Sequence, residues 1–440
     1  MKKQLLTLLS LAIVSISFGQ SWTTQNSKVP VSGAGLSRIS IKDANIAWAS
    51  FYNGNPGAPS QYLKYVSVTA NGGTTWTSKL VSNLPTNALI SDIQTIDSQK
   101  AFIVTAPESG SGAANGLWKT ENGGTSWTKV TGVFSNASFG NIVYFWDTNN
   151  GIVIGDPVNG KYEMYKTTDG GNSWSVLTTA PSQTNDDYGY VGGKVVFGEN
   201  MWLTSNTGKI LHTADRGLTW KSYFAPIDDF EGEEVNGSMS FSSATYGLIV
   251  DNSSTLWFTE DGGQNWDIKA SDSYFDGDIK YVPGSTNTFI STGINGSSSL
   301  GTGSAYSNDG GQNWTVIESG TQTGTLGAYD CNTVWAGQFT SDAAGTGGLL
   351  KLDGGVPNCS LAVNDQVLSK VELKAVVNAN TLNIIASKEV KSVLVGDMTG
   401  RKLTEVNSKN VNVSNLKPGV YYARVAYADG AFGTVKFIIK

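Results

Sequence analysis

An eight-residue pattern that occurs six times constrains the fold of this 440-residue chain more than any other feature. It reads Ser or Thr, any residue, Asp or Asn, any residue, Gly, any residue, a small polar residue, and Trp. The copies begin at Thr69, Thr120, Thr167, Thr213, Thr259 and Ser307, so successive copies lie 46 to 51 residues apart. A repeat of this length is typical of propellers and solenoid arrays.

The residue types of the pattern predict a tight hairpin followed by a strand. Asp or Asn at the third position accepts backbone N–H groups within a turn, and Gly at the fifth position tolerates a positive φ. The Trp then begins the next strand and buries its ring between neighbouring sheets. We therefore expect a structural role for these residues of the six copies: Asn71, Trp76, Asn122, Trp127, Asp169, Trp174, Asp215, Trp220, Asp261, Trp266, Asp309 and Trp314.

The pattern resembles the Asp-box, or BNR, repeat of sialidase-type β-propellers, including the sortilin-like and photosystem-assembly-factor branches. The resemblance implies that each box lies between the third and the outermost strand of a blade. The composition agrees with an all-β fold, because Gly (52 residues) and aromatic residues (10%) are abundant and charged residues make up only 15%.

Six boxes predict seven blades, because the ends of the propeller segment supply one more. Strand-like residues recur after Trp314, and Leu349–Leu352 runs into Asp353-Gly-Gly with no Trp behind it. The missing half, Ser21-Trp22-Thr-Thr, lies near the N-terminus. A ring closed by this N-terminal strand leaves no open sheet edge.

Two cysteines flank the predicted closure, Cys331 within the seventh blade and Cys359 just after it. Oxidation is expected in a secreted chain, and a bridge would close a loop of 28 residues. The alternative is a pair of buried thiols.

The first 19 residues have the pattern of a secretory signal peptide. Lys2 and Lys3 precede an apolar run from Leu5 to Phe18, which is shorter than the roughly 20 residues that span a bilayer. We expect cleavage before Gln20. The predicted propeller then covers residues 20–357 and a linker covers residues 358–373.

Residues 374–440 form a second predicted domain, a small antiparallel β-sandwich in which the boxes and Trp are absent. Its segments at 395–403, 416–422 and 433–440 resemble the type A C-terminal sorting domain of the Bacteroidetes type IX secretion system. The resemblance implies recognition by the outer-membrane machinery, with release of the propeller or its attachment to the cell surface. An ordinary appended binding module is the alternative.

The charged residues exclude several functions. A net charge of −6 supplies no basic excess to displace counterions from nucleic acid. Sialidases of this fold hold the substrate carboxylate with three arginines. Of Arg38, Arg216, Arg401 and Arg424, only Arg38 is expected to line the centre, so a sialidase is excluded. The single histidine, His212, provides neither a histidine metal cluster nor a Ser-His-Asp site.

Carboxylates and aromatic rings gather in three successive loops, which the propeller resemblance places on the face opposite the boxes. The candidate ligand- or ion-binding residues are Asp186, Asp187, Tyr188, Tyr190, Asp228, Asp229, Phe230, Glu231, Glu233 and Glu234, and the third loop adds Asp272, Tyr274, Phe275, Asp276 and Asp278. Such a set is often only a solvated face, but it also suits a saccharide or Ca²⁺.

Two functions follow as hypotheses. The first is a secreted or cell-surface, non-catalytic, monomeric protein that binds a glycan, an ion or a protein on the acidic and aromatic face, with no cofactor other than a candidate Ca²⁺. The second is a glycoside hydrolase or lyase that acts on polysaccharide. A hydrolase requires a carboxylate pair about 5–5.5 Å apart for retention or about 6.5–9.5 Å apart for inversion.

Overall fold

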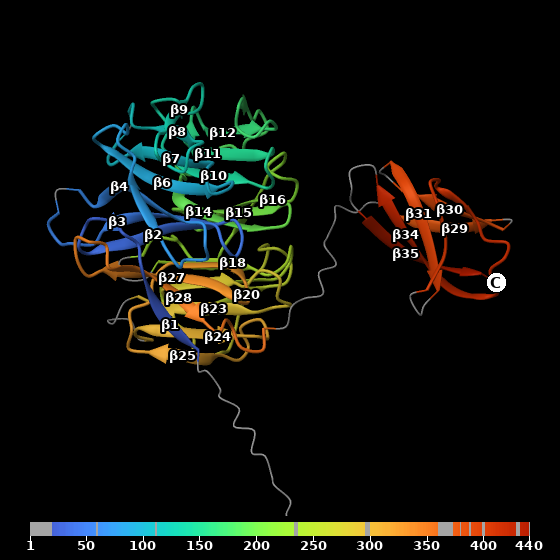
Figure 1. Cartoon of the computed structure of the whole chain (residues 1–440). Coiled ribbons are helices and arrows are strands. Elements are labelled where there is room, and N and C mark those ends of the chain that lie inside the picture. The colour runs from blue at the N-terminus through green and yellow to red at the C-terminus, as the bar shows by residue number, and fades with distance from the viewer. Residues whose placement is uncertain are drawn as a thin grey trace, which may run out of the picture. The chain divides into compact units, whose positions relative to one another are not determined.

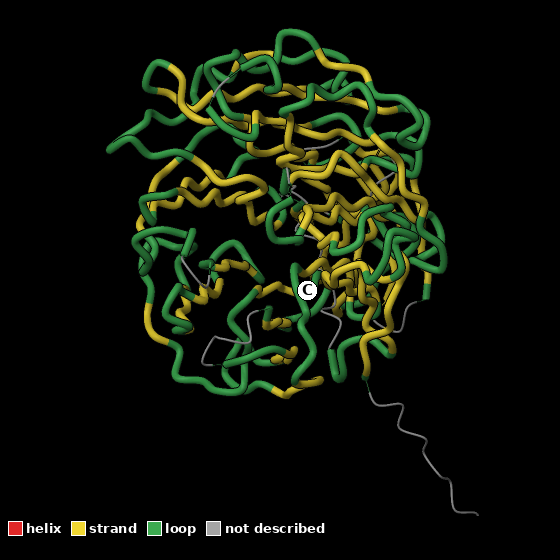
Figure 2. The backbone as a smooth tube through the Cα atoms, turned by 90° about the vertical axis from the view of Figure 1, so that its left-hand side faces the viewer, coloured by secondary structure: helices red, strands yellow, loops and turns green. Residues whose placement is uncertain are grey.

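The computed structural model describes residues 20–58, 60–110, 112–232, 236–294, 300–359, 373–378, 380–386, 389–397, 401–427 and 432–439. The chain divides into two compact units, residues 1–363 and residues 364–440 (Figure 1). All regular structure in these described ranges is β-strand (Figure 2), and no helix long and apolar enough to cross a membrane occurs in them. The signal peptide predicted for residues 1–19 and most of the predicted linker lie outside the described residues.

The first unit is a seven-bladed β-propeller, as the repeat predicts. Each blade has four antiparallel strands and starts with its innermost strand, and a single pairing of Gly35 with Phe339 joins blades 1 and 7 into one sheet. Blade 1 contains β2 (Ala34–Ile41), β3 (Ala47–Asn53), β4 (Tyr62–Thr69) and β5 (Thr77–Leu80). Blade 2 contains β6 (Ala88–Thr95), β7 (Ala101–Pro107), β8 (Gly116–Thr120) and β9 (Thr128–Val130). Blade 3 contains β10 (Gly140–Phe145), β11 (Gly151–Val158), β12 (Lys161–Thr167) and β13 (Ser175–Val176).

The remaining blades follow in chain order. Blade 4 contains β14 (Gly189–Phe197), β15 (Asn200–Ser205), β16 (Lys209–Thr213) and β17 (Lys221–Phe224). Blade 5 contains β18 (Ser238–Phe241), β19 (Gly247–Val250), β20 (Leu256–Thr259) and β21 (Asp267–Ile268). Blade 6 contains β22 (Asp278–Tyr281), β23 (Phe289–Gly293), β24 (Gly303–Ser307) and β25 (Thr315–Ser319). Blade 7 contains β26 (Leu326–Asp330), β27 (Thr333–Thr340), β28 (Gly347–Asp353) and β1 (Ser21–Asn26).

The N-terminal strand closes the ring. In β1, Trp22 pairs with Leu352 of β28, and the register runs from Ser21 opposite Asp353 to Asn26 opposite Gly348. The seventh blade therefore takes three strands from the end of the propeller and one from its beginning, which confirms the predicted closure. A disulfide joins Cys331 to Cys359, whose Cα atoms are 5.9 Å apart.

Each copy of the eight-residue pattern forms its own hairpin between the third and fourth strands of a blade. In the third copy, Thr167 Oγ1 donates to Asp169 Oδ1 at 2.8 Å, and Asp169 Oδ1 accepts the Ser173 N–H at 3.0 Å. The same two bonds occur in all six copies. The Ser173 hydroxyl, with the other local donors, holds the pKa of Asp169 well below its usual value. These Asp and Asn side chains are thus used within their own turns.

The pattern tryptophans pack between neighbouring blades. Trp127 of blade 2 meets Trp48 of blade 1 edge to face, with 6.1 Å between ring centroids, and Trp76 meets Trp335 of blade 7 at 6.2 Å. Trp48 and Trp335 are fully buried. Truncating a buried indole to Ala costs about 3–5 kcal/mol, so these contacts are a main source of cohesion between blades.

The second unit is a small sandwich of two antiparallel sheets, which confirms the predicted fold class. One sheet contains β29 (Lys374–Asn378), β30 (Thr381–Ile385) and β33 (Asn410–Asn412). The other contains β32 (Lys402–Val406), β31 (Val390–Asp397), β34 (Gly419–Tyr427) and β35 (Phe432–Ile439). Leu382 and Val411 of the first sheet pack with Val393, Val425 and Phe437 of the second in one buried core.

Candidate functional site

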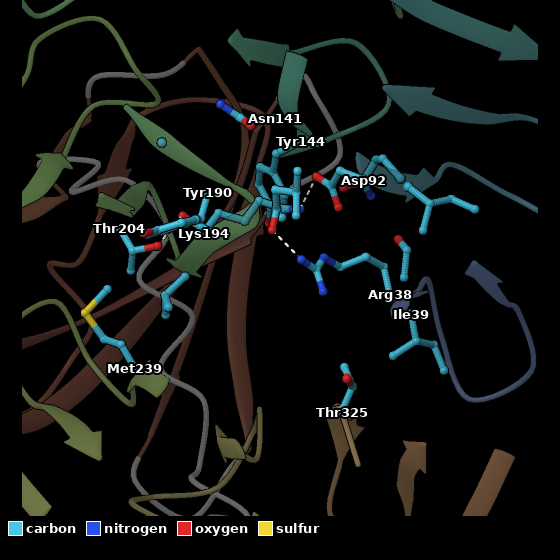
Figure 3. A pocket seen from close by; sticks show the side chains of 18 of the residues that line it. Arg38, Ile39, Asp92, Asn141, Tyr144, Tyr190, Lys194, Thr204, Met239 and Thr325 are labelled. Atoms are coloured by element: carbon cyan, nitrogen blue, oxygen red, sulfur yellow. Dashed lines mark hydrogen bonds and ion pairs between the residues drawn. The ribbon is translucent and has the colours of Figure 1, made fainter. Parts of the chain in front are cut away.

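A cavity of about 980 Å³ lies at the centre of the propeller, and the innermost strand of every blade contributes to its wall (Figure 3). The lining combines apolar and aromatic residues of the inner strands, such as Ile39, Ile93 and Tyr144, with charged residues such as Arg38, Asp92 and Lys194. A cavity of this size is in the range of small-molecule and short-peptide sites. Its wall therefore holds the candidate functional groups of this protein.

A bulge in the inner strand of blade 4 projects into this centre. The β14 register jumps from Gly189 opposite Ser205 to Lys194 opposite Leu203, which leaves residues 190–193 outside the regular pairing. Gly192 has φ 60°, and a Cβ there would lie 2.0 Å from Arg38 Nε. The bulge therefore requires glycine at this position.

Arg38 reaches from blade 1 to this bulge. Its guanidinium donates to the Val191 carbonyl and, at 2.8 Å, to the Ser37 carbonyl. Figure 3 shows the side chain extending toward the segment that carries Tyr190 and Lys194. Burial lowers the pKa of Arg38, although Asp92 and Asp278 oppose this shift. The guanidinium thus links β2 to β14 on a different blade.

An ion pair forms a second link between blades. Lys194 of blade 4 bonds to Asp92 of blade 2, and Asp92 also accepts the Val143 N–H of blade 3 at 3.0 Å. The Asp92 side chain is 2% exposed, and burial lowers the pKa of Lys194 despite this partner. Removing one member of a buried pair leaves an uncompensated charge. The pair therefore holds three blades at a fixed separation.

Asp278 has the same kind of role between blades 5, 6 and 7. Its two oxygens accept the Ser238 hydroxyl and the Leu326 N–H, each at 2.8 Å. Both oxygens are therefore used to join inner strands, whereas Asp92 binds both of its partners through Oδ2.

Asp156 of β11, like Asp92, makes its hydrogen bonds through one of its two oxygens. Oδ1 accepts the Asn141 amide at 2.6 Å and the Gly189 N–H at 3.1 Å, and no described residue donates to Oδ2. Burial raises the pKa of Asp156 to about 6, against these two hydrogen bonds. Asn141 is 1% exposed, and its Oδ1 has no hydrogen-bond partner among the described residues.

The first acidic loop of the sequence prediction splits into buried and accessible residues. Asp186 is exposed, whereas Asp187 is fully buried and paired with Lys209. Tyr188 and Tyr190 line the cavity, with their rings edge to face and centroids 5.9 Å apart. Of the acidic and aromatic residues expected in this loop, the two tyrosines line the cavity, whereas Asp187 is used in a buried ion pair.

The second and third loops are likewise partly used by the fold. Asp228 and Glu231 are exposed, Phe230 is buried at the cavity wall, and Glu233 and Glu234 lie outside the described residues. Asp229 accepts a hydrogen bond from the Tyr190 hydroxyl. Burial is the main cause of the raised pKa of Tyr190, and this hydrogen bond is the second.

In the third loop, Asp272 is exposed, while Tyr274, Phe275 and Asp276 are buried, and Asp276 accepts the Ser254 hydroxyl. No cluster of three or more His, Cys, Asp or Glu side chains suited to a metal ion occurs in the part of the chain that the structure describes.

Sequence reasoning placed Arg38 correctly at the centre but missed Asp92, Asn141, Asp156 and Lys194. Each could have been recognised as a single polar or charged residue within a strand predicted to be buried, as Asp92 is between apolar and threonine residues. The run Gly-Tyr-Val-Gly-Gly before Lys194 was a second signal, since adjacent glycines indicate an irregular strand.

Comparison with known families identifies the second unit. Residues 378–440 match the family model of the secretion system C-terminal sorting domain. This domain directs export through the type IX secretion system, so the chain is a secreted β-propeller protein with a C-terminal sorting domain.

Curated relatives and solved structures concern the propeller. The chain is 25% identical over 156 residues to the chloroplastic photosystem II stability/assembly factor HCF136 of rice and 26% identical over 139 residues to that of Arabidopsis thaliana. These matches cover 34% and 31% of this chain, and the chain spans about a third of each relative, 33% and 31%.

Two solved structures share the propeller fold at low identity. YCF48 bound to a D1 peptide has a TM-score of 0.52 at 15% identity, covering 77% of this chain and 96% of that one. An ancestral GH74 enzyme has a TM-score of 0.51 at 12% identity, covering 94% of this chain and 64% of that one. At these identities the likeness establishes the fold alone.

Proposed function

We propose that this protein is a non-catalytic binding protein of the cell surface or the medium, and that its ligand enters the central cavity beside Tyr188 and Tyr190. The observation that carries the proposal is that three charged groups of the cavity wall are already bonded to other parts of the protein. Asp92, Lys194 and Asp278 are bonded across blades and hold the ring, so they are poorly placed to exchange protons with a substrate.

One structural relative, YCF48, is bound to a peptide, which supports a binding role for a propeller of this fold. The chain's own surface supports a partner that is not nucleic acid, because the net charge is −6 and Asp186, Asp228 and Glu231 are exposed beside the cavity. A glycan or a protein segment fits these conditions.

Filling the cavity tests the proposal. The wild-type protein is first tested for binding on glycan and peptide arrays. Thr325 is half-buried in the cavity wall, and Thr325→Trp is expected to abolish binding to every glycan or peptide that the wild type binds. Thr77→Trp, on an exposed outer-strand position, is the matched control and should bind as the wild type does. Binding that survives Thr325→Trp would place the ligand elsewhere.

A polysaccharide hydrolase is the second candidate, favoured by the raised pKa of Asp156, since a general acid needs a pKa close to the working pH. The propeller is incubated with a polysaccharide panel and new reducing ends are measured. No turnover is expected. Turnover that Asp156→Asn abolishes would establish the enzyme and end the non-catalytic proposal.

The sorting role is tested separately. Deleting residues 374–440 is expected to retain the propeller inside the cell in a host with a type IX system, as measured by surface labelling and by immunoblots of the medium. Undiminished appearance outside the cell would refute this role.

A further inference from the structure

The strongest feature that the proposed function leaves unused is a set of unsatisfied polar atoms below an aromatic rim. Asp156 Oδ2 and Asn141 Oδ1 both lack a donor among the described residues, and both residues contribute to the cavity wall. Of these two atoms only Asn141 Oδ1 is buried, and a buried acceptor without a partner costs about 1–3 kcal/mol. A water molecule or a ligand hydroxyl that supplies the missing donor removes this cost.

The polar pair is tied directly to the aromatic rim. Gly189, which donates to Asp156, lies between Tyr188 and Tyr190 in the chain. Tyr188 is 42% exposed, and its backbone N–H is anchored to Asn206 Oδ1 at 2.8 Å. The Tyr190 hydroxyl is held by Asp229, and the Tyr188 ring contacts the Tyr190 ring edge to face. Rigid aromatic rings offer contact area at a low cost in conformational entropy.

Gly192 and Gly193 leave the wall beside this pair without side chains. The space that a Cβ would occupy is taken by Arg38 at Gly192 and by the Thr204 hydroxyl at Gly193, so the bulge packs its backbone directly against these side chains.

From this arrangement we infer that Tyr188, Asp156 and Asn141 form a subsite for a neutral saccharide unit. The ring of Tyr188 provides an apolar face for the C–H groups of a pyranose. Asp156 Oδ2 and Asn141 Oδ1 accept its hydroxyl hydrogens, and a small movement of Asn141 brings its buried oxygen into reach. This inference rests on the proposed function and names the ligand class for the same cavity.

Charge favours a neutral ligand over an acidic one. Glu231 lines the cavity and is exposed, Asp186 and Asp228 are exposed in the same two loops, and Asp156 adds a further carboxyl at the subsite. The two cavity cations nearest the bulge are engaged, Lys194 by Asp92 and Arg38 by the Val191 carbonyl. Lys42 and Lys280 also line the cavity, so the expected preference for a neutral sugar rests on the carboxyl groups near Tyr188 and Asp156 rather than on a lack of cations.

The experiment uses the full secreted chain and isothermal titration with cellohexaose, xylohexaose, mannohexaose and an acidic control, hexagalacturonate. At least one neutral hexasaccharide is expected to bind, and the acidic one to bind at least tenfold more weakly. Tyr188→Ala and Asp156→Asn should each weaken binding tenfold or more. Asp156→Asn retains the Oδ1 acceptor for Asn141 and Gly189 but replaces the ligand-facing acceptor by a donor, so it tests hydrogen bonding without removing the local support.

Tyr62→Ala is the matched control, because Tyr62 is 41% exposed and lies outside the cavity wall. Its binding should equal that of the wild type. The inference fails if none of the three neutral hexasaccharides binds, or if Tyr188→Ala and Asp156→Asn both bind with wild-type affinity.

A displayed peptide library separates this failure from that of the proposed function. One outcome is that peptides bind the wild type but not Thr325→Trp, and that no saccharide binds. This outcome would overturn the saccharide subsite but leave the proposed binding function of the cavity intact. Saccharide binding that the Tyr188 and Asp156 substitutions weaken supports both.

Discussion

Replacing Asp156 by Asn should stabilise the propeller at neutral and alkaline pH and have little effect on stability near pH 4. Burial raises the pKa of this carboxyl from 3.8 to about 6. A carboxyl with a raised pKa in the folded state contributes stability that is present below pH 3.8 and is lost as the pH rises through about 6.

The size of the effect follows from the shift of two units, which corresponds to about 3 kcal/mol of free energy of unfolding. An amide at this position still accepts the Asn141 and Gly189 donors, but a neutral acceptor makes weaker bonds than a carboxylate. We therefore expect Asp156→Asn to exceed the wild type by about 1–2 kcal/mol at pH 8.

Urea unfolding followed by tryptophan fluorescence measures this difference at pH 4.5, 6 and 8. All 13 tryptophans lie between Trp22 and Trp335, so the signal reports the propeller and not the sorting domain. Asp186→Asn is the control, because Asp186 is exposed and its substitution should change stability by less than about 0.5 kcal/mol at every pH. A difference between Asp156→Asn and the wild type that stays constant from pH 4.5 to 8 would refute the raised pKa.

Three further outcomes are expected. Asp187→Asn leaves buried Lys209 without its counter-ion and should cost about 3–5 kcal/mol in urea unfolding; a cost below 1 kcal/mol would contradict the buried pair. Burial, aided by Lys221, lowers the pKa of His212 to about 4, so its contribution to stability is lost as the pH falls from 6.5 through 4. Because this ring is partly exposed, the loss is about 1–2 kcal/mol, and His212→Gln should flatten that part of the pH–stability curve. Reduction of the bridge between Cys331 and Cys359 should lower the free energy of unfolding by about 3–4 kcal/mol, the chain-entropy value for a 28-residue loop, and a double Ser variant should lose this sensitivity to reductant.

The ring and its closure could be predicted from the sequence because the interactions that define a blade are local. Thr167, Asp169 and Ser173 bond within seven residues of one another, so the motif specifies its own hairpin in every repeat. The half-motifs at Trp22 and Asp353 then predicted the pairing of the two ends, since each completes the other.

The cavity could not be predicted in the same way, because its contacts join residues from different blades. Arg38 bonds to Val191, 153 positions away, and Lys194 bonds to Asp92, 102 positions away. Nothing in a single sequence relates one of these residues to the other. Both contacts are made at the bulge of β14. Neither its glycines nor the alternation of residues along the strand specifies the shift in register there.

The acidic loops show a related limit of the sequence pattern. A carboxylate in a loop looks the same in a sequence whether its partner is solvent or protein. Asp187 forms an ion pair with Lys209. Asp229 accepts a hydrogen bond from the Tyr190 hydroxyl, and Asp276 accepts one from the Ser254 hydroxyl. Three of the carboxylates that the sequence suggested as ligand-binding groups are therefore bonded to other side chains of the protein.

These contacts divide the centre of the propeller into a part that supports the ring and a part that is available to a ligand. Asp92, Lys194 and Asp278 bond across blades with well-directed partners, so a ligand that competed for them would have to break a buried ion pair or two backbone-anchored bonds. Tyr188 and the second oxygen of Asp156 support no other blade, and a ligand gains their interactions without opening the ring. Specificity should therefore change through substitutions at the rim, whereas substitutions at the ion pair should change stability first and binding only as a consequence.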